Sequence, residues 1–586
     1  MERTTVRGTR IARVLPDVTG LDKVFDYLVP EDMVLDVHMG SVVRVPLHGR
    51  RVAGWVVGLD PPDRSVDIGR IRPIAKVSSR GPDGGIVDLA GWASVRWAAG
   101  RLRPFLVTAS PATNVAGLPP NRRTGSRPEP ANADAAGLLS SGGGALRLPP
   151  SADVIGVLLA AAACGPLLVI GPSPDRARID AARLRRTGLT VALYPQEWAA
   201  AAAGVDVVIG ARSAAWAPCP DLAAVVVVDE HDEALQEERS PTWHARDVVV
   251  ERARRAGVPV LLVSPCPTII GSAAVGERLA RVPVDEERAG WPVVEVVDRS
   301  RDEPWKTSLV TSPLISHLRS ADRTVVCVHN VPGRARIIAC RSCKALARCE
   351  RCDAAVGLAD DATLVCRRCA TVRPGVCLVC GSSAFANLRP GVTRLREELE
   401  AAAGRPVVAV TGRDGDRPAA AGVYVGTEAV LHRVPRADVV AFLDLDGELL
   451  APRYRAAEQA MALLVRAARL VGPRTGGGRL LVQTFLPRHE VVQAALLADP
   501  GRLHEPERAR RRLLQLPPFA ALASISGAGS DAIAAALRAT AGISVGGAEG
   551  AWTARAATWD ELGRAIVAAP RPKGSRVRVA VDPPRQ

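Results

Sequence analysis

Short apolar runs separated by turn residues fill the first 75 positions of the chain. Rough alternation of apolar and polar residues, rich in Val, Ile and Leu, is typical of β-strands. Proline and glycine stand between the runs and indicate turns. The pattern predicts a small β-rich domain with strands at Ile11–Leu15, Lys23–Val29, Ser41–Pro46 and Arg51–Leu59. A looser helical pattern follows at Val87–Ala99.

The composition changes between Ser110 and Pro150, where Pro, Gly, Asn, Ser and Ala dominate. This stretch includes the glycine run Ser140–Gly144, which reads SSGGG. Small and polar residues without periodicity are typical of flexible linkers. We therefore expect a mobile connection here.

Helical patterns then alternate with short, almost wholly apolar runs. Such runs are typical of strands covered on both faces, and a repeated βα pattern favours a doubly wound, mainly parallel sheet. A first set occupies residues 151–290, and a second set lies beyond residue 390 and contains a long helix at Tyr454–Val471. Residues 500–586 follow as a smaller α+β segment. The pattern predicts two α/β lobes and a C-terminal domain.

The charge of the chain adds information about its partners. The 586 residues include 76 Lys+Arg and 61 Asp+Glu, a formal net charge of +15. Such a surplus is typical of proteins that bind a polyanion, but a surface of solvated arginines would give the same count. A motif is needed to decide between the two interpretations. Apolar residues make up 47%, which excludes disorder of the whole chain. Because we find neither a secretory signal nor an uninterrupted apolar stretch of membrane-spanning length, we expect a soluble, cytoplasmic protein.

Eight of the 12 cysteines form four C-x-x-C pairs between Cys340 and Cys380. Each pair can place two thiolates on one face of a turn, and two pairs complete a tetrahedral zinc site. Ferredoxin-type iron–sulfur spacings are absent, and a thioredoxin-type motif needs one pair rather than four. The window therefore predicts two structural zinc ions. The spacing alone permits nested, serial or interleaved pairing.

An acidic tetrad, Asp229, Glu230, His231 and Asp232, directly follows a buried apolar run. Ligands bind at this edge of open α/β sheets, and carboxylates there can hold Mg²⁺ against a nucleotide phosphate. The alternative is an ordinary polar strand end before an acidic helix start.

The surrounding segments resemble the PriA family of primosomal replication-restart proteins, which are superfamily 2 DNA helicases. The resemblance rests on IGARSAAWAPCPDL, VVVVDEHDEALQEERSPTWHARDVVV, GVTRLREEL, GTEAVLHRVPRADVVAFLDLDGEL and, near the N-terminus, LDKVFDYLVPEDM with VVRVPLHGRRVAGWVVGL. These segments occur in the order of the family, as does the cysteine spacing. The resemblance covers most of the chain and is weakest at residues 79–150.

The resemblance implies a multidomain α/β fold with two RecA-like helicase lobes, an inserted two-zinc module, a β-rich N-terminal DNA-binding domain and a small α+β C-terminal domain. The implied boundaries are 1–78 for the domain that binds DNA 3′ ends, 79–145 for a degraded winged-helix region and linker, 146–300 for the first lobe, 301–339 for the start of the second, 340–385 for the zinc insertion, 386–495 for the second lobe and 496–586 for the C-terminal domain.

The resemblance also implies which residues act. The outer cysteine pairs would share one zinc ion and the inner pairs the other: Cys340, Cys343, Cys377 and Cys380, then Cys349, Cys352, Cys366 and Cys369. In the N-terminal domain we expect DNA contacts from Asp17, Lys23, Arg44, Arg50 and Arg51, with Asp17 near the terminal 3′-OH.

The elements of ATP chemistry depart from the family pattern. A phosphate-binding loop needs Gly-Lys-[Ser/Thr], yet that tripeptide is absent, and Pro149 and Pro150 stand where the loop should open the first lobe. The acidic tetrad is one glutamate shorter than in the family. The arginine-finger segment reads LLVRAARLVGPR, in which only Arg466 or Arg469 could substitute. We therefore expect the tetrad to be vestigial and assign no catalytic residue.

The sequence thus predicts a replication-restart primosome protein that binds DNA at stalled or repaired forks, at 3′ ends and at single-strand/duplex junctions, without helicase or ATPase activity. Its expected partners are DNA, primosome proteins and single-strand-binding protein, at the nucleoid and away from membranes. The alternatives are an active ATP-dependent 3′→5′ helicase and a general zinc-ribbon scaffold for RNA or protein.

Overall fold

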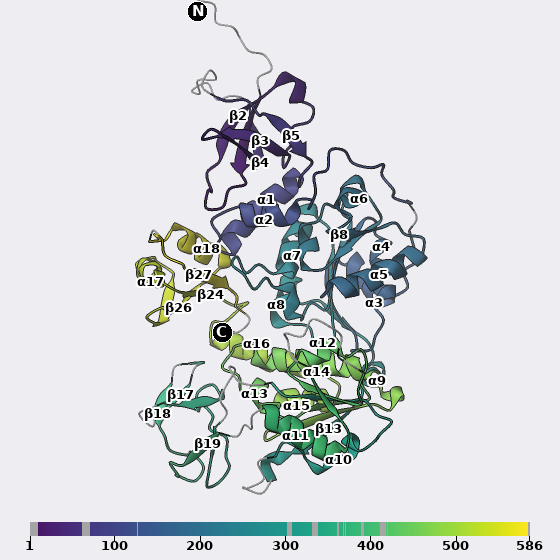
Figure 1. The fold of residues 1–586 in the computed structure, drawn as a ribbon, viewed down its shortest axis with the longest axis vertical. Coiled ribbons are helices and arrows are strands. Elements are labelled where there is room, and N and C mark those ends of the chain that lie inside the picture. Colours follow the sequence, from purple (N-terminus) through teal and green to yellow (C-terminus); the bar gives the residue numbers. More distant parts are fainter. Residues whose placement is uncertain are drawn as a thin grey trace, which may run out of the picture.

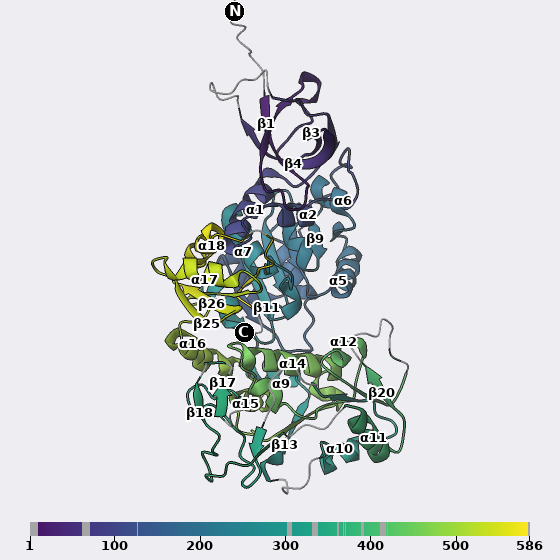
Figure 2. The same ribbon diagram turned by 60° about the vertical axis from the view of Figure 1, so that its left-hand side comes forward.

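The computed structural model describes residues 10–60, 71–125, 127–301, 308–330, 338–359, 363–366, 368–369, 371–387, 392–410, 418, 420–572 and 574–583. The N-terminal sheet lies at one end, a first parallel-sheet lobe in the middle, and a second lobe with the cysteine module at the other end (Figure 1). The turned view shows the same order, with the C-terminal domain beside the first lobe (Figure 2). Over these described ranges no helix has the length and apolarity that crossing a bilayer requires.

The N-terminal domain is a five-stranded antiparallel sheet in the order β2-β1-β4-β3-β5. Alternate side chains such as Val14, Tyr27 and Val43 point into a small apolar core. The four predicted strands are confirmed within two residues at nearly every end. The strands are β1 (Arg10–Pro16), β2 (Phe25–Val29), β3 (Val42–Leu47), β4 (Arg50–Asp60) and β5 (Lys76–Ser79).

Two helices, α1 (Gly84–Arg96) and α2 (Arg103–Ala109), follow this sheet. The predicted helix at 87–99 is confirmed, shifted by three residues. Its start is set by Asp83, whose side chain accepts a hydrogen bond from the backbone N–H of Ile86 at 2.9 Å.

The predicted linker is wrong from residue 133 onward. Residues Ala133–Ser140 form helix α3, and Gly143–Arg147 form strand β6, which pairs with a strand more than 100 residues away. The glycines serve close packing rather than flexibility. A Cβ at Gly143, where φ is +103°, would lie 2.2 Å from the carbonyl oxygen of Val260.

The first lobe is a seven-stranded parallel sheet in the order β12-β6-β11-β10-β7-β9-β8, as the βα pattern predicts. Its remaining strands are β7 (Leu167–Ile170), β8 (Val191–Tyr194), β9 (Val207–Gly210), β10 (Ala224–Val228), β11 (Val260–Ser264) and β12 (Leu279–Arg281). Its helices are α4 (Ile155–Ala162), α5 (Pro174–Arg186), α6 (Trp198–Ala203), α7 (Ala245–Ala256), α8 (Ile269–Ala274) and α9 (Val284–Ala289).

The second lobe is a six-stranded parallel sheet in the order β13-β23-β22-β14-β21-β20. Its first strand lies before residue 300, where the sequence placed the first lobe, because β13 pairs along its whole length with β23. The strands are β13 (Val293–Asp298), β14 (Val325–Val328), β20 (Val407–Val410), β21 (Val423–Gly426), β22 (Val439–Phe442) and β23 (Arg479–Thr484). The helices are α10 (Ser312–Leu318), α11 (Val392–Ala403), α12 (Val430–Arg433), α13 (Asp446–Leu449), α14 (Ala456–Val471) and α15 (Glu490–Leu496).

The cysteine module interrupts the second lobe between β14 and α11 and consists of two small antiparallel sheets. Its strands are β15 (Ile338–Cys340), β16 (Val356–Leu358), β17 (Thr363–Cys366), β18 (Val372–Pro374) and β19 (Phe385–Asn387).

The C-terminal domain packs against the first lobe and α1, and all three contribute to one apolar core. In that core the ring of Trp216 lies 5.3 Å from the ring of Phe105 and 5.8 Å from that of Trp243, measured between centroids. The domain's antiparallel sheet has the order β25-β26-β24-β27. Its elements, after the connecting helix α16 (His504–Leu513), are β24 (Ala521–Ser526), α17 (Ser530–Arg538), β25 (Ser544–Ala548), β26 (Ala551–Ala556), α18 (Trp559–Ala568) and β27 (Arg578–Val581).

Candidate metal centres and the interface between the lobes

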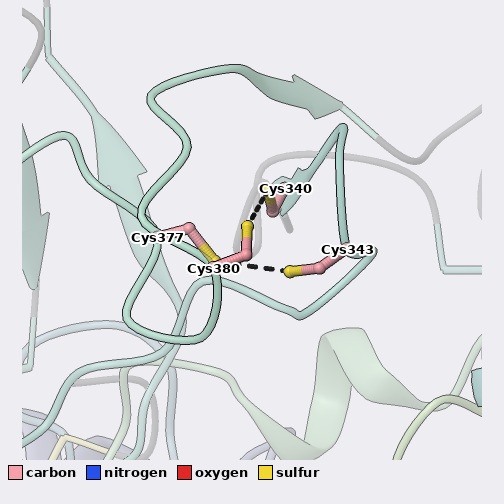
Figure 3. A group of neighbouring side chains, drawn as sticks. All are labelled: Cys340, Cys343, Cys377 and Cys380. Carbon is pink, nitrogen blue, oxygen red and sulfur yellow. Dashed lines mark hydrogen bonds between the residues drawn. The ribbon is translucent and has the colours of Figure 1, made fainter.

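The outer cysteine pairs converge on one point (Figure 3). The sulfur atoms of Cys340 and Cys380 are 3.5 Å apart, as are those of Cys343 and Cys377, and all four lie within 4.8 Å of one another. Four thiolates bound tetrahedrally to zinc at about 2.3 Å have sulfur–sulfur distances of about 3.8 Å. The four atoms are therefore spaced as one tetrahedral metal ion requires.

The inner pairs form a second set of the same kind, made of Cys349, Cys352, Cys366 and Cys369. Here the sulfurs of Cys349 and Cys369, and those of Cys352 and Cys366, are also 3.5 Å apart. The structure thus groups the eight cysteines in the nested sets that the family resemblance implies. Each cluster has four protein ligands and could hold one metal ion without an open position.

Tight turns explain how each pair presents two sulfurs to one point. Three pairs are followed by a residue in the left-handed region: Lys344 at φ +64°, Asp353 at +61° and Gly381 at +73°. The backbone N–H of each of these residues donates to the carbonyl oxygen of the first cysteine of its pair, at 2.9–3.0 Å. This closed turn keeps the two thiols on one side.

The acidic tetrad lies at the carboxyl end of β10, as predicted, and faces the second lobe. Asp229 is 5% exposed and accepts two hydrogen bonds from the guanidinium of Arg469 in α14, at 2.7 and 2.8 Å. Asp232 accepts one hydrogen bond from the guanidinium of Arg466, at 2.6 Å. The two arginines that sequence reasoning considered as finger residues therefore neutralise the tetrad itself.

The other two tetrad side chains are held within the first lobe. Glu230 is 1% exposed and lies 3.3 Å from Arg246, and it also accepts hydrogen bonds from the N–H and hydroxyl of Thr268 at 2.6 and 3.0 Å. The His231 ring lies 2.8 Å from the hydroxyl of Ser264. Burial lowers the pKa of His231 to about 4, so its ring is neutral at physiological pH.

The phosphate-loop position after β6 offers no phosphate cradle. Pro149 and Pro150 are buried and have no N–H to donate, and the chain has no lysine between Lys76 and Lys306. Instead, the carbonyl oxygen of Pro150 accepts a hydrogen bond from Nε of Arg469 at 3.0 Å. The same arginine thus contacts both the loop position and the first acidic residue.

The Asp229–Arg469 pair has a predictable pH dependence. Burial alone would raise the pKa of Asp229, but the charge and hydrogen bonds of Arg469, together with weaker nearby positive charges, lower the pKa to about 2, from an ordinary 3.8. Because the folded pKa is depressed, the pair stabilises the fold fully above about pH 4 and loses this contribution as the pH falls toward 2. In denaturant unfolding, Asp229→Asn should lower the unfolding free energy by about 2 kcal/mol at neutral pH, and the difference should shrink below about pH 4.

The control for this pH series is Asp221→Asn. Asp221 pairs with Arg123 at 2.7 Å but is 80% exposed, so its removal should change the unfolding free energy by less than about 1 kcal/mol. A difference between wild type and Asp229→Asn that stays constant from neutral pH to about pH 3 would contradict the assignment.

The residues predicted to contact DNA fall into two places on the N-terminal sheet. Asp17 and Arg44 are both neighbours of Ala53 in β4. The backbone N–H of Asp17 donates to the carbonyl oxygen of Ala53, and Arg44 of β3 is the strand partner of Ala53. Arg50 and Arg51 lie at the β3–β4 hairpin, and with Arg44 and Lys23 they are exposed. Sequence reasoning missed Arg103 of α2, which lies 2.8 Å from Asp17 and is 86 positions away.

The chain and its N-terminal domain are similar to known proteins. Residues 13–103 match a family model described as the 3′DNA-binding domain (3′BD). The chain is 32% identical to the probable replication restart protein PriA of Mycobacterium tuberculosis over 571 residues, which covers 87% of this chain and 85% of that one. It is 26% identical to the replication restart protein PriA of Bacillus subtilis, over 55% of this chain and 43% of that one.

Among solved structures, Dbp5 of Saccharomyces cerevisiae bound to RNA and ADP BeF3 matches at 10% identity, over 64% of this chain and 89% of that one. Its TM-score of 0.35 is too low to add to the assignment. The relatives aligned along most of their length are decisive: this chain belongs to the PriA family of replication restart proteins.

Proposed function

We propose that this protein binds DNA at stalled or repaired replication forks and assists primosome assembly without hydrolysing ATP. The observation that carries the proposal is the bidentate pair between Asp229 and Arg469. Phosphoryl transfer needs a metal held by the acidic residues and a cradle of N–H groups and lysine for the phosphates. Here Arg469 forms an ion pair with the carboxylate of Asp229, and Pro149 and Pro150 stand at the position of the phosphate-binding loop.

The DNA-binding half of the proposal is supported by the match to a 3′DNA-binding domain and by the family of the chain. Exposed arginines on the N-terminal sheet and a net charge of +15 suit a phosphate backbone. In this proposal Asp17 stays near the 3′ end, with Lys23, Arg44, Arg50 and Arg51 contacting phosphates. Arg103 holds the side chain of Asp17 in place through their ion pair.

The remaining parts of the chain are assigned by the same proposal. The two parallel sheets correspond to the RecA-like lobes of the family, and the C-terminal domain packs against the first of them. The two four-cysteine clusters hold structural zinc, since an all-thiolate tetrahedral set suits Zn²⁺. Primosome proteins and single-strand-binding protein are the proposed partners at the nucleoid.

The test measures ATP turnover and fork binding on the same preparation. We expect turnover far below about 1 per second with forked DNA, since typical enzymes reach that rate. We expect forks with a free 3′ end to bind more tightly than forks whose 3′ end is blocked. Reversing Arg50 and Arg51 to glutamate should weaken fork binding at least about tenfold and flatten its salt dependence, because two phosphate contacts are lost.

The matched control reverses an exposed arginine elsewhere, Arg186→Glu at the end of α5, and should leave fork binding within about twofold. Turnover above about 1 per second would support the alternative, an active 3′→5′ helicase. Equal binding of free and blocked 3′ ends would contradict the role assigned to the N-terminal domain.

A further inference from the structure

One helix of the second lobe supplies a row of contacts to the first lobe. Glu458, Gln459, Arg466 and Arg469 all belong to α14. Positions 459, 466 and 469 are separated by seven and three residues, which places them on one side of the helix, and Glu458 lies next to Gln459. Helix α14 lies on the side of the second lobe that is nearest the first lobe (Figure 2).

Each of these side chains has a named partner across the interface. Arg469 binds Asp229 and the carbonyl oxygen of Pro150, and Arg466 binds Asp232. At the other end of the face, Gln459 hydrogen-bonds Glu233, and Glu458 accepts the backbone N–H of Ile269 at 2.8 Å. The row therefore spans about three turns of the helix.

The two carboxylates are largely buried at the interface, and their arginine partners are more exposed. The exposed fractions are 5% for Asp229, 13% for Asp232, 22% for Arg466 and 37% for Arg469. In such surroundings an ion pair is screened less by salt than an exposed pair, and removing one partner leaves an uncompensated charge. Separating the lobes would expose four charged groups that now neutralise one another.

Helix α14 is also held at its start by helix α16. Glu458 lies 2.6 Å from Arg511 of α16, and the same arginine lies 2.7 Å from Glu507. Arg511 is fully buried. Because α16 holds the start of α14, the row of contacts acts on a rigid element.

We propose that Arg466 and Arg469 of α14 form a charge latch with Asp229 and Asp232 of the first lobe, which holds the two lobes in one arrangement without nucleotide. This inference rests on the proposed function, since it assigns the vestigial acidic tetrad a role in fixing the lobes. In a cycling motor the lobes change their separation with nucleotide state. Here the acidic residues and arginines at the position of a nucleotide site form ion pairs with each other.

The test follows the distance between the lobes in the full chain by single-molecule energy transfer. Fluorophores are attached through bioorthogonal amino acids at exposed Arg186 of α5 and Glu397 of α11, which spares the cysteines. Wild type should show one narrow distribution that Mg²⁺-ATP leaves unchanged. Arg469→Asp should raise the fraction of molecules outside that distribution at least about tenfold, because like charges then face each other.

Two further variants keep the test decisive. The double variant Asp229→Arg with Arg469→Asp should restore the wild-type distribution, and Arg474→Asp, an exposed change of equal charge just after α14, should not alter it. A wild-type distribution in Arg469→Asp, or a shift of wild type with Mg²⁺-ATP, would overturn the latch. ATP hydrolysis by wild type, measured on the same samples, would instead overturn the proposed function.

Discussion

Replacing Cys366 by serine is expected to unfold the cysteine module and, if both clusters hold the proposed zinc, to lower the metal content from two ions per chain to one or none. Cys366 lies at the end of β17, 1% exposed, in a small core with Leu364 and Cys349. So small a core contributes little stability of its own. Structural zinc contributes about 10–16 kcal/mol of folding free energy in zinc-finger peptides, so losing a ligand removes most of the support.

Metal release with a chromophoric chelator and limited proteolysis would measure this effect, with new cleavage sites expected between residues 338 and 387. Cys164→Ser, a partly exposed cysteine outside both clusters, is the control and should keep both ions. The melting of the first lobe should be the same in both variants, because the module interrupts only the second lobe. Retention of two ions and of protease resistance by Cys366→Ser would contradict the assignment.

Local patterns in the sequence were enough to predict four of the five strands of the N-terminal sheet, all but β5, and to locate the cysteine pairs and the acidic tetrad. Strand periodicity is a property of a few consecutive residues, so Ile11–Leu15 and Arg51–Leu59 could be found without knowing their partners. The cysteine spacing is equally local. The nested pairing of the clusters, by contrast, came from the family resemblance, because the spacing permits other pairings.

Contacts between distant residues could not be predicted in this way. Strand β6 was mistaken for a linker because its glycines are explained only by the backbone of Val260, which they approach closely. Strand β13 was placed in the wrong lobe because its partner β23 lies almost 200 residues further on. The periodicity of α14 indicated a helix, but not that Arg469 would meet Asp229, 240 positions away.

A second large effect is expected from Arg96→Met, which should lower the free energy of unfolding by about 3 kcal/mol. Arg96 ends α1, is 8% exposed, and lies 3.1 Å from Asp247 of α7 and 2.8 Å from Asp582 after β27. Its guanidinium also lies over the ring of Trp559, at 4.3 Å. One side chain thus joins the N-terminal helices, the first lobe and the C-terminal domain.

Methionine keeps the apolar stem but removes the charge, which leaves two buried carboxylates with fewer partners. Asp247 retains its ion pair with Arg246 at 2.8 Å, and Asp582 retains the hydrogen bond from the indole N–H of Trp559 at 3.0 Å. The loss of unfolding free energy should therefore lie near the lower end of the range seen when one partner of a buried ion pair is removed. Denaturant unfolding gives the magnitude, and faster hydrogen exchange in β27 would locate it. The control is Arg101→Met, whose pair with Asp22 is 4.0 Å long and about 40% exposed, and which should change stability by less than about 1 kcal/mol. If the two variants were equally stable, the C-terminal domain would have to be held by its apolar contacts with α1 and the first lobe alone.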